Sequence, residues 1–341
     1  MGRARATVVL FTRDLRVHDQ PALAAASRDA ESVVPLFVLD EAILKGPFAR
    51  PNRLAFLHDA LVDLDRSLRE RGSRLHVRRG DVVREVVAVA KAAGAEAVHA
   101  SADASDYAQR RERRLESALA NERIELRLFD TTTIVATDEA RTSAGEHFSV
   151  FTPFYRRWRQ AARRAVLPAP RRLRTSTQID AGRLPSRGRL VRGSPSPDLP
   201  PGGERAARAR MTSWIRSGLE RYGELHDDLA ADATSRLSPY LHFGCLSPVE
   251  LAERVRERRG GEPFLRQLCW RDFYHQLLAA RPQTPRTDMR PRGDRWSDDG
   301  PALEAWKAGR TGYPLVDAGM RQLLREGFMH NRARVPSPRR S

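Results

Sequence analysis

Cysteine, lysine and long apolar runs are scarce in this 341-residue chain, and each shortage excludes a class of protein. The two cysteines, Cys245 and Cys269, cannot build a disulfide framework or a zinc cluster, which fits a reducing, cytoplasmic environment. No run approaches the roughly 18 apolar residues of a membrane span, and residues 1–12 are too weakly apolar for a signal peptide. The nine histidines lack the spacing of metal ligands, so we expect no metal site.

The positive charge is large and is carried almost wholly by arginine. Lys and Arg number 60 against 43 Asp and Glu, which gives a formal charge of +17, and the only lysines are Lys45, Lys91 and Lys307. Two interpretations stay open, since arginine can accumulate by drift in a GC-rich genome or can serve a nucleic-acid partner. In either case a pI near 11.1 attracts polyanions in a salt-dependent way.

The first 130 residues alternate between strand and helix patterns. Short β-branched and apolar runs predict strands at residues 7–12, 33–39, 75–77, 97–100 and 124–129. Helical patterns between them predict helices at residues 21–28, 54–71, 82–93 and 107–121. This alternation predicts an α/β, Rossmann-like domain with a parallel sheet covered by helices on both faces. No G-x-G-x-x-G follows the first strand, so the usual dinucleotide site is not expected there.

A connector and a helical domain are expected to follow, which divides the chain at 1–130, 131–203 and 204–341. Residues 131–165 carry short aromatic and basic segments, and Pro, Arg, Ser and Gly dominate from 166 to 203, which predicts a long surface linker. The last third shows no strand-like alternation and has helical patterns at residues 204–222, 248–258, 263–280, 301–308 and 314–326. The second domain is therefore expected to be all-α.

The first segment with chemical content is ATSRLSPYLHFGCL, at residues 233–246. Thr234, Ser235 and Ser238 place three hydroxyls within five residues, and Arg236 lies among them. Hydroxyls and free N–H groups at a helix start, beside a guanidinium, suit a phosphate or pyrophosphate. An ordinary helix N-cap has the same composition, so both interpretations stand.

The second segment is FLRQLCWRDFYHQLL, at residues 264–278. Its apolar residues fall nearly all round a helical wheel, which predicts a helix buried on several sides. Gln267, Trp270, Arg271 and Tyr274 form one stripe that can stack and hydrogen-bond. Such a stripe suits a planar heterocycle, such as a base or a flavin. A core helix with an Arg–Asp pair is the alternative.

The third segment covers residues 306–334 and ends in MHNRAR. Residues 312–314 begin a helix that Gly327 ends. The amide of Asn331 can read a base edge, and Arg332 and Arg334 can reach phosphates or pair with a carboxylate. Basic segments after helices are frequent, so this segment is weak evidence by itself.

Together these segments resemble the photolyase/cryptochrome family of blue-light flavoproteins, which includes DNA photolyases. The resemblance runs in order through VVLFTRDLRVHDQPAL, TSRLSPYLHFG, QLCWRDFY, GRTGYPLVDAGMRQL and MHNRAR, and it covers residues 5–334. It implies an α/β antenna domain, a long connector and an all-α FAD-binding domain, which is incomplete here.

The resemblance also implies roles for individual residues. The FAD phosphates and ribityl region would be held by Tyr222, Thr234, Ser235, Arg236, Leu237 and Ser238. The flavin side would be lined by Arg271, Asn331 and Arg334. DNA would be contacted by Gln267, Trp270, Arg332 and His226, and the residues closest to the reaction would be Trp270, Gln267 and Asn331. Trp296 matches the outermost tryptophan of an electron-transfer chain.

The implied activity is light-driven repair of cyclobutane pyrimidine dimers in DNA by an electron from reduced FAD, a carbon–carbon lyase reaction. An extruded dimer would stack on Trp270, and a lesion that is already distorted costs less to flip. Asn331 favours the cyclobutane dimer, because relatives that repair (6-4) photoproducts carry a histidine there. Two departures weaken the assignment: Gln267 stands where many relatives have a glutamate, and His226 where a close relative has an arginine. A cryptochrome-like photoreceptor and an inactive DNA-binding remnant are the alternatives.

An antenna pigment is expected in the amino-terminal domain. Residues 102–114 (ADASDYAQRRERR) are similar to those of deazaflavin-using relatives more than to those of folate users, although an arginine-rich helix is also typical of a solvated face. The expected partner is DNA that contains pyrimidine dimers, without a membrane, and we expect a monomer.

The carboxyl terminus departs most from the family pattern. Family members continue past MHNRAR into helices that supply acidic FAD contacts, an asparagine at the flavin and two inner tryptophans of the relay. Here VPSPRRS follows, and Pro336 and Pro338 cannot continue a helix. We expect a frameshift, a premature stop or a fragment rather than a natural short form. An open flavin pocket would leave apolar faces in water and Arg334 without a carboxylate, so we expect weak FAD binding or poor solubility.

Overall fold

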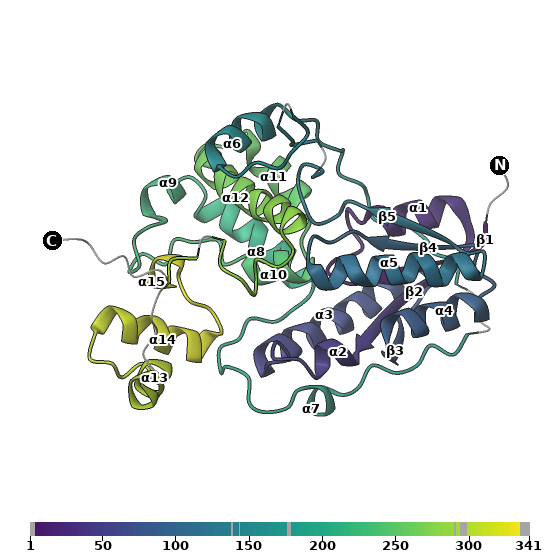
Figure 1. Cartoon of the computed structure of the whole chain (residues 1–341), viewed down its shortest axis with the longest axis horizontal. Coiled ribbons are helices and arrows are strands. Elements are labelled where there is room, and N and C mark those ends of the chain that lie inside the picture. The colour runs from purple at the N-terminus through teal and green to yellow at the C-terminus, as the bar shows by residue number, and fades with distance from the viewer. Residues whose placement is uncertain are drawn as a thin grey trace.

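A parallel five-stranded sheet forms the first part of the chain, as the alternating pattern predicted (Figure 1). The computed structural model describes residues 4–137, 139–142, 144–175, 179–289, 291–293 and 299–334. The strands are β1 (Ala4–Phe11), β2 (Ala30–Asp40), β3 (His76–Gly80), β4 (Ala97–Ser101) and β5 (Glu125–Phe129). Their order in the sheet is β3-β2-β1-β4-β5, and all four pairings are parallel.

Helices cover both faces of the sheet because its central strands are apolar on both sides. In β1, Val8 and Leu10 face one core, whereas Val9 and Phe11 face the other. The helices of this part are α1 (Pro21–Asp29), α2 (Glu41–Leu44), α3 (Pro51–Arg69), α4 (Val82–Ala92) and α5 (Asp106–Asn121). Helices α4 and α5 pack on the first face, and α1 and α3 pack on the second. The α/β prediction is confirmed.

The connector contains a helix that its composition did not predict. Residues 151–160, expected as short aromatic and basic segments, form α6 (Phe151–Gln160). The helix forms because Phe151, Phe154 and Trp158 recur at helical spacing, and all three are buried in the core.

The rest of the connector runs along the α/β domain and includes the single turn α7 (Arg187–Leu190). The N–H of Val77 in β3 donates to the carbonyl of Ala181 over 2.8 Å, and the N–H of Val33 donates to the carbonyl of Arg174 over 2.7 Å. The first bond covers a backbone group of the edge strand β3 that would otherwise remain open for pairing with another chain. The second covers a backbone group of β2 before its pairing with β3 begins.

The second part is helical, as predicted. Its helices are α8 (Glu204–Ser217), α9 (Tyr222–Leu225), α10 (Ser238–Phe243), α11 (Pro248–Arg256), α12 (Gly261–Ala280), α13 (Gly300–Lys307), α14 (Pro314–Glu326) and α15 (Asn331–Arg334). The single helix expected at residues 204–222 is wrong, because the first helix ends at Ser217 before Gly218 and a new turn begins at Tyr222. Helix α12 lies against α6, α9 and α11.

Helices α13 and α14 leave apolar side chains in solvent. Helix α14 packs against both α13 and α15, away from the sheet (Figure 1). The exposed apolar side chains of these helices and the loop between them are Leu303, Trp306, Tyr313, Leu315 and Leu324. This exposure contrasts with α12, whose apolar residues are mostly buried.

The loop between β1 and α1 joins the two parts of the molecule. The N–H of Leu15 donates to the carbonyl of Phe243 over 3.2 Å, and Nη1 of Arg16 donates to the carbonyl of Gly244 over 3.0 Å. Gly244 ends α10 with a φ of 66°, and a Cβ there would stand 1.9 Å from the carbonyl oxygen of Arg13. Only glycine allows this approach of the two backbones.

Two buried carboxylates complete the junction. Glu204 accepts hydrogen bonds from the N–H groups of Val17 and His18 over 2.8 and 3.0 Å. Asp19 pairs with Arg164 and accepts a hydrogen bond from the Ser247 hydroxyl. Each carboxylate therefore connects the β1–α1 loop to a segment more than a hundred residues away.

We expect Gly244→Ala to destabilise the protein more than the same substitution at another glycine with a left-handed backbone. Gly94 provides the control, because its φ is 59° and a Cβ there meets no atom within 4 Å. Gly94→Ala should cost roughly 1–2 kcal/mol of conformational strain. Gly244→Ala adds the clash with Arg13 and should cost at least about 2 kcal/mol more. Urea unfolding measures both, and equal losses would contradict the close contact.

The junction should also make stability depend on pH. Burial by itself would raise the pKa of Asp19, but hydrogen bonds from Arg164, Ser247 and the Leu167 N–H outweigh it and hold the pKa below the ordinary 3.8. The stability from this ionised carboxylate is fully present above pH 3.8 and is lost as the pH falls through its lower folded pKa. The stability difference between wild type and Asp19→Asn should therefore shrink between pH 5 and about pH 2. Asp288→Asn, at an exposed position, is the control; a constant difference for Asp19→Asn would refute this account.

Candidate ligand site in the helical domain

A cavity of about 500 Å³ collects three of the predicted site residues, Arg236, Ser238 and Arg334. Its other walls come from the start of α3, from α10, from the connector and from the end of α14. Asn52, Arg53 and Phe56 of α3 belong to the α/β part, so the cavity lies between the two parts of the molecule. These three residues could not be predicted from the sequence, because nothing local in α3 distinguishes them from a solvated helix start.

Arg236 connects two walls of the cavity. Its backbone is left-handed, with a φ of 55°, which is strained for a residue with a Cβ. Its guanidinium donates to Asp232 over 2.9 Å and to Glu326 over 2.6 Å, and it lies over the ring of Phe328 at 4.8 Å. Burial by itself would lower the pKa of Arg236, but the two carboxylates outweigh it and raise the pKa. Arg236 thus holds the end of α14 against the loop before α10.

The hydroxyls next to Arg236 do not form an ordinary N-cap. Helix α10 begins at Ser238, and Leu237 before it caps no backbone N–H with its side chain. The hydroxyl of Ser235 accepts from the N–H of Leu237 over 3.3 Å. The hydroxyl of Thr234 is buried and has no hydrogen-bond partner among the described residues. A buried hydroxyl without a partner is costly and suits a ligand atom that would satisfy it.

Tyr222 lies outside this cavity, in an aromatic cluster. Its ring meets those of Trp214 and Phe264 edge-on, with centroids 5.7 and 5.2 Å apart, and that of His226 at 5.1 Å. Burial raises the pKa of Tyr222 to about 12, so the phenol stays neutral. His226 lies 3.4 Å from Asp227, which also pairs with Arg332. The structure therefore brings His226 and Arg332 to one carboxylate.

The stripe that Gln267, Trp270, Arg271 and Tyr274 form on α12 is partly exposed and partly in contact with the connector. Gln267 and Tyr274 are exposed, and Trp270 is half-buried. The indole of Trp270 stacks on Phe151 of α6 with centroids 3.6 Å apart and planes 4° apart, and Tyr274 lies at 5.7 Å. The stack on Phe151 could not be predicted, because α6 itself was not. One indole face is covered in this structure.

Arg271 and Asp272 form the Arg–Asp pair that was the alternative interpretation of this helix. Their charged atoms lie 3.7 Å apart, and Arg271 also donates to the carbonyl of Thr132. Asp272 accepts from the N–H of Ile134 over 2.8 Å and from the indole of Trp158 over 2.9 Å. Burial lowers the pKa of Arg271 to about 10. The pair anchors the connector and does not line the Arg236 cavity.

The last predicted residues lie in or next to α15. Asn331 and Arg332 are exposed, and Arg334 donates through Nε to the carbonyl of Met329 over 3.1 Å. His330, which the sequence analysis did not single out, is buried with its Nε2 unpartnered within the described chain. Trp296 lies outside the described residues.

A second polar region lies at the carboxyl ends of the strands. The strand order reverses its direction between β1 and β4, which is where open α/β sheets commonly bind ligands. Asp14 after β1 accepts from Ser101 over 2.5 Å, and Arg13 pairs with Asp103 at 3.0 Å. Burial raises the pKa of Asp14. Beside them, Tyr107 at the start of α5 donates to Asp40 at the end of β2.

No helix in the described residues is long and apolar enough to cross a membrane. The described residues also contain no group of three or more His, Cys, Asp and Glu side chains that could hold a metal ion.

Comparison with known proteins connects both regions to one family. The family model for DNA photolyase matches residues 7–172, and the model for the FAD binding domain of DNA photolyase matches residues 264–337. A deoxyribodipyrimidine photo-lyase of Streptomyces griseus is 52% identical over 332 residues, which are 96% of this chain and 72% of that protein. A cryptochrome DASH of Natronomonas pharaonis is 35% identical, over 96% of this chain and 74% of that protein. The solved structure of a bacterial class III photolyase from Agrobacterium tumefaciens superposes with a TM-score of 0.91 at 28% identity, over 98% of this chain and 72% of that one.

Proposed function

Because this chain belongs to the DNA photolyase family, we propose that it binds FAD and repairs cyclobutane pyrimidine dimers in DNA with light. The observation that carries this proposal is the 52% identity to the Streptomyces griseus deoxyribodipyrimidine photo-lyase across 96% of the chain. The formal charge of +17 supports it, since a basic surface supplies sequence-independent affinity for DNA. We expect the protein to act as a cytoplasmic monomer.

The Arg236 cavity fits the polar half of FAD. The exposed Ser238 can donate to phosphate oxygens, and Arg236 and Arg334 line the same cavity. Thr234, two residues before Arg236, does not line the cavity but has an unpartnered hydroxyl that can also donate to a ligand. We assign the phosphate and ribityl side to Tyr222, Thr234, Ser235, Arg236, Leu237 and Ser238, and the flavin side to Arg271, Asn331 and Arg334. Of these residues only Arg236, Ser238 and Arg334 line the cavity, so the assignment of the others rests on the family motifs.

FAD, when bound and reduced, supplies the electron that opens the dimer in the light. The chain's residues bind and orient the substrate. The indole of Trp270 has one face covered by Phe151, which leaves the side next to Tyr274 for a flipped base. The exposed amide of Gln267 can donate to and accept from base edges but adds no charge. Arg332 and His226 contact Asp227, which a DNA phosphate would have to displace.

We assign an antenna chromophore to the carboxyl ends of β1, β2 and β4. The Tyr107–Asp40 hydrogen bond and the guanidinium of Arg111, 6.0 Å from the centre of the Tyr107 ring, provide stacking and hydrogen-bonding groups there. A deazaflavin is favoured over a folate by the resemblance of residues 102–114 to those of deazaflavin-using relatives. A second candidate function is a photoreceptor that binds flavin without repair, because cryptochrome DASH proteins are among the relatives.

We expect Thr234→Val to weaken FAD binding without destabilising the ligand-free protein. Its hydroxyl has no partner in the described chain, so the substitution removes no internal hydrogen bond. Loss of one hydrogen bond to a phosphate should weaken binding roughly tenfold. Flavin fluorescence titration measures the affinity, and thermal unfolding without FAD measures stability. Thr212→Val, at an exposed threonine of α8, is the matched control. Equal FAD affinity for wild type and Thr234→Val would contradict the assignment.

The repair activity is tested with the 341-residue chain, FAD and a single-stranded oligonucleotide that carries one thymine dimer. Blue light should restore the thymines, as measured by chromatography, whereas the dark reaction should not. Trp270→Ala should weaken dimer binding about tenfold to a hundredfold, because stacking contributes roughly 1–3 kcal/mol per base. Trp306→Ala, on the exposed face of α13, is the control.

Each outcome of this assay separates the candidate functions. Bound flavin without repair would favour the photoreceptor, and the absence of both would favour the DNA-binding remnant. Either result would overturn the proposed repair function. Mass spectrometry of pigments released from the same preparation identifies the antenna chromophore.

A further inference from the structure

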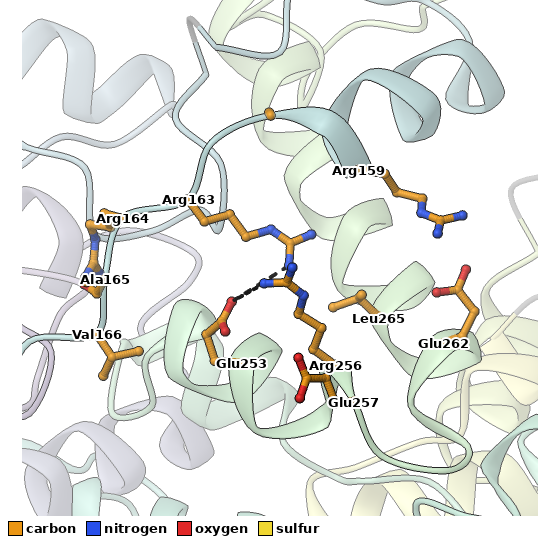
Figure 2. Close-up of a pocket in the computed structure, with 11 residues that line it drawn as sticks. Arg159, Arg163, Arg164, Ala165, Val166, Glu253, Arg256, Glu257, Glu262 and Leu265 are labelled. Atoms are coloured by element: carbon orange, nitrogen blue, oxygen red, sulfur yellow. Dashed lines mark hydrogen bonds and ion pairs between the residues drawn. The ribbon is translucent and has the colours of Figure 1, made fainter.

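A separate cleft of about 860 Å³ lies between α6, the connector and the helices α11 and α12 (Figure 2). It shares no lining residue with the Arg236 cavity. Arg159 comes from the last turn of α6, Arg163 from the connector and Arg256 from the end of α11. Its volume lies in the range of small-molecule sites.

The guanidinium groups of Arg163 and Arg256 point to the same place in this cleft (Figure 2). Both lie near one carboxylate oxygen, Oε1 of Glu253, at 3.9 Å for Arg163 and 3.5 Å for Arg256. These distances allow ion pairing but exceed those of good hydrogen bonds. Within the part of the chain that the structure describes, the guanidiniums of Arg159, Arg163 and Arg256 donate no hydrogen bond.

Arg163 is a half-buried arginine whose ion pair is long. Its side chain is 11% exposed, and its guanidinium lies 4.5 Å from the centre of the Trp158 ring. Burial, and then the charge of Arg256, lower the pKa of Arg163. Arg16, which is buried, satisfies its guanidinium with backbone carbonyls, among them that of Gly244. Arg163 has five N–H donors and meets Glu253 only at 3.9 Å, so its guanidinium is available to an anion that enters the cleft.

The remaining charged groups of the cleft are already engaged or oppose an anion. Arg164 turns away and pairs with the buried Asp19. Glu262 accepts from the hydroxyl of Tyr155. Glu253 and Glu257 reduce the positive charge of the cleft, so an anion has to compete with Glu253 for the two guanidiniums.

We propose that this cleft binds a phosphate group between the guanidiniums of Arg163 and Arg256. A phosphate dianion offers oxygens to both planar forks at hydrogen-bond distance, whereas Glu253 offers one oxygen at a longer distance. Leu265 and Val166 give the cleft an apolar wall that can accept the organic part of a phosphate ester. The phosphate can belong to a free nucleotide or to a DNA backbone. This site does not depend on the proposed repair function.

The test uses the whole chain and inorganic phosphate as the probe. Sodium phosphate should raise the melting temperature more than sodium chloride of equal ionic strength, since a ligand of the folded state stabilises it. Isothermal titration calorimetry should show at least tenfold weaker phosphate binding for Arg163→Gln and Arg256→Gln. Glu253→Gln should bind phosphate several-fold more tightly, because it removes the competing carboxylate.

Arg258→Gln is the matched control. Arg258 follows the same helix end and is exposed, and it does not line this cleft. The substitution removes one positive charge, so it should leave phosphate binding within twofold of wild type. If Arg163→Gln fails to fold because it loses its contact with Trp158, the exposed Arg256→Gln still decides the result. Absence of phosphate-specific stabilisation, or equal losses for Arg258→Gln and Arg256→Gln, would overturn the proposal.

Two further titrations identify the source of the phosphate. If the DNA backbone occupies the cleft, Arg256→Gln should reduce the salt dependence of binding to undamaged duplex DNA by about one phosphate contact. If a free nucleotide occupies it, DNA binding should be unchanged, and ADP affinity should follow the pattern of the phosphate titration. Insensitivity of both DNA and ADP binding to Arg256→Gln would also count against the site.

Discussion

The molecule depends on the junction between the β1–α1 loop and the helical part. Arg16, Asp19 and Glu204 are buried there, and each is held by hydrogen bonds to distant segments. Charged groups are costly in a protein interior unless they are fully paired, so this arrangement tolerates little rearrangement. The close contact of Gly244 with Arg13 fixes the distance between the two backbones. The relative position of sheet and helices follows from this junction.

The proposed FAD site is a consequence of that junction. One wall of its cavity belongs to α3 and the other walls to α10, α14 and the connector, so neither half alone contains it. The ion pairs of Arg236 with Asp232 and Glu326 then fix the loop that carries Thr234 and Ser238. A strained backbone at Arg236 is maintained because both carboxylates hold its side chain.

The arginines of this chain have different roles, and the partners of each side chain decide which role it has. Arg271 and Arg16 are satisfied by carbonyl groups and serve to hold segments together. Arg332 pairs with an exposed aspartate, an interaction that contributes little to stability and is easily exchanged for another anion. Arg163 is half-buried and meets a carboxylate oxygen of Glu253 only at 3.9 Å, which leaves its guanidinium available to another anion. A net charge alone cannot distinguish these three situations.

The sheet, most helices and the order of the family motifs could be predicted from the sequence, because local periodicity and short segments set them. A strand with a continuous apolar run, such as β1, buries the side chains on both of its faces. The tertiary structure alone decided that α6 covers one face of Trp270, that Asn52 and Phe56 line the cavity and that Arg163 meets Arg256. These contacts join residues more than ninety positions apart in the sequence. They depend on how buried charges are paired across the junction, and no local pattern encodes that pairing.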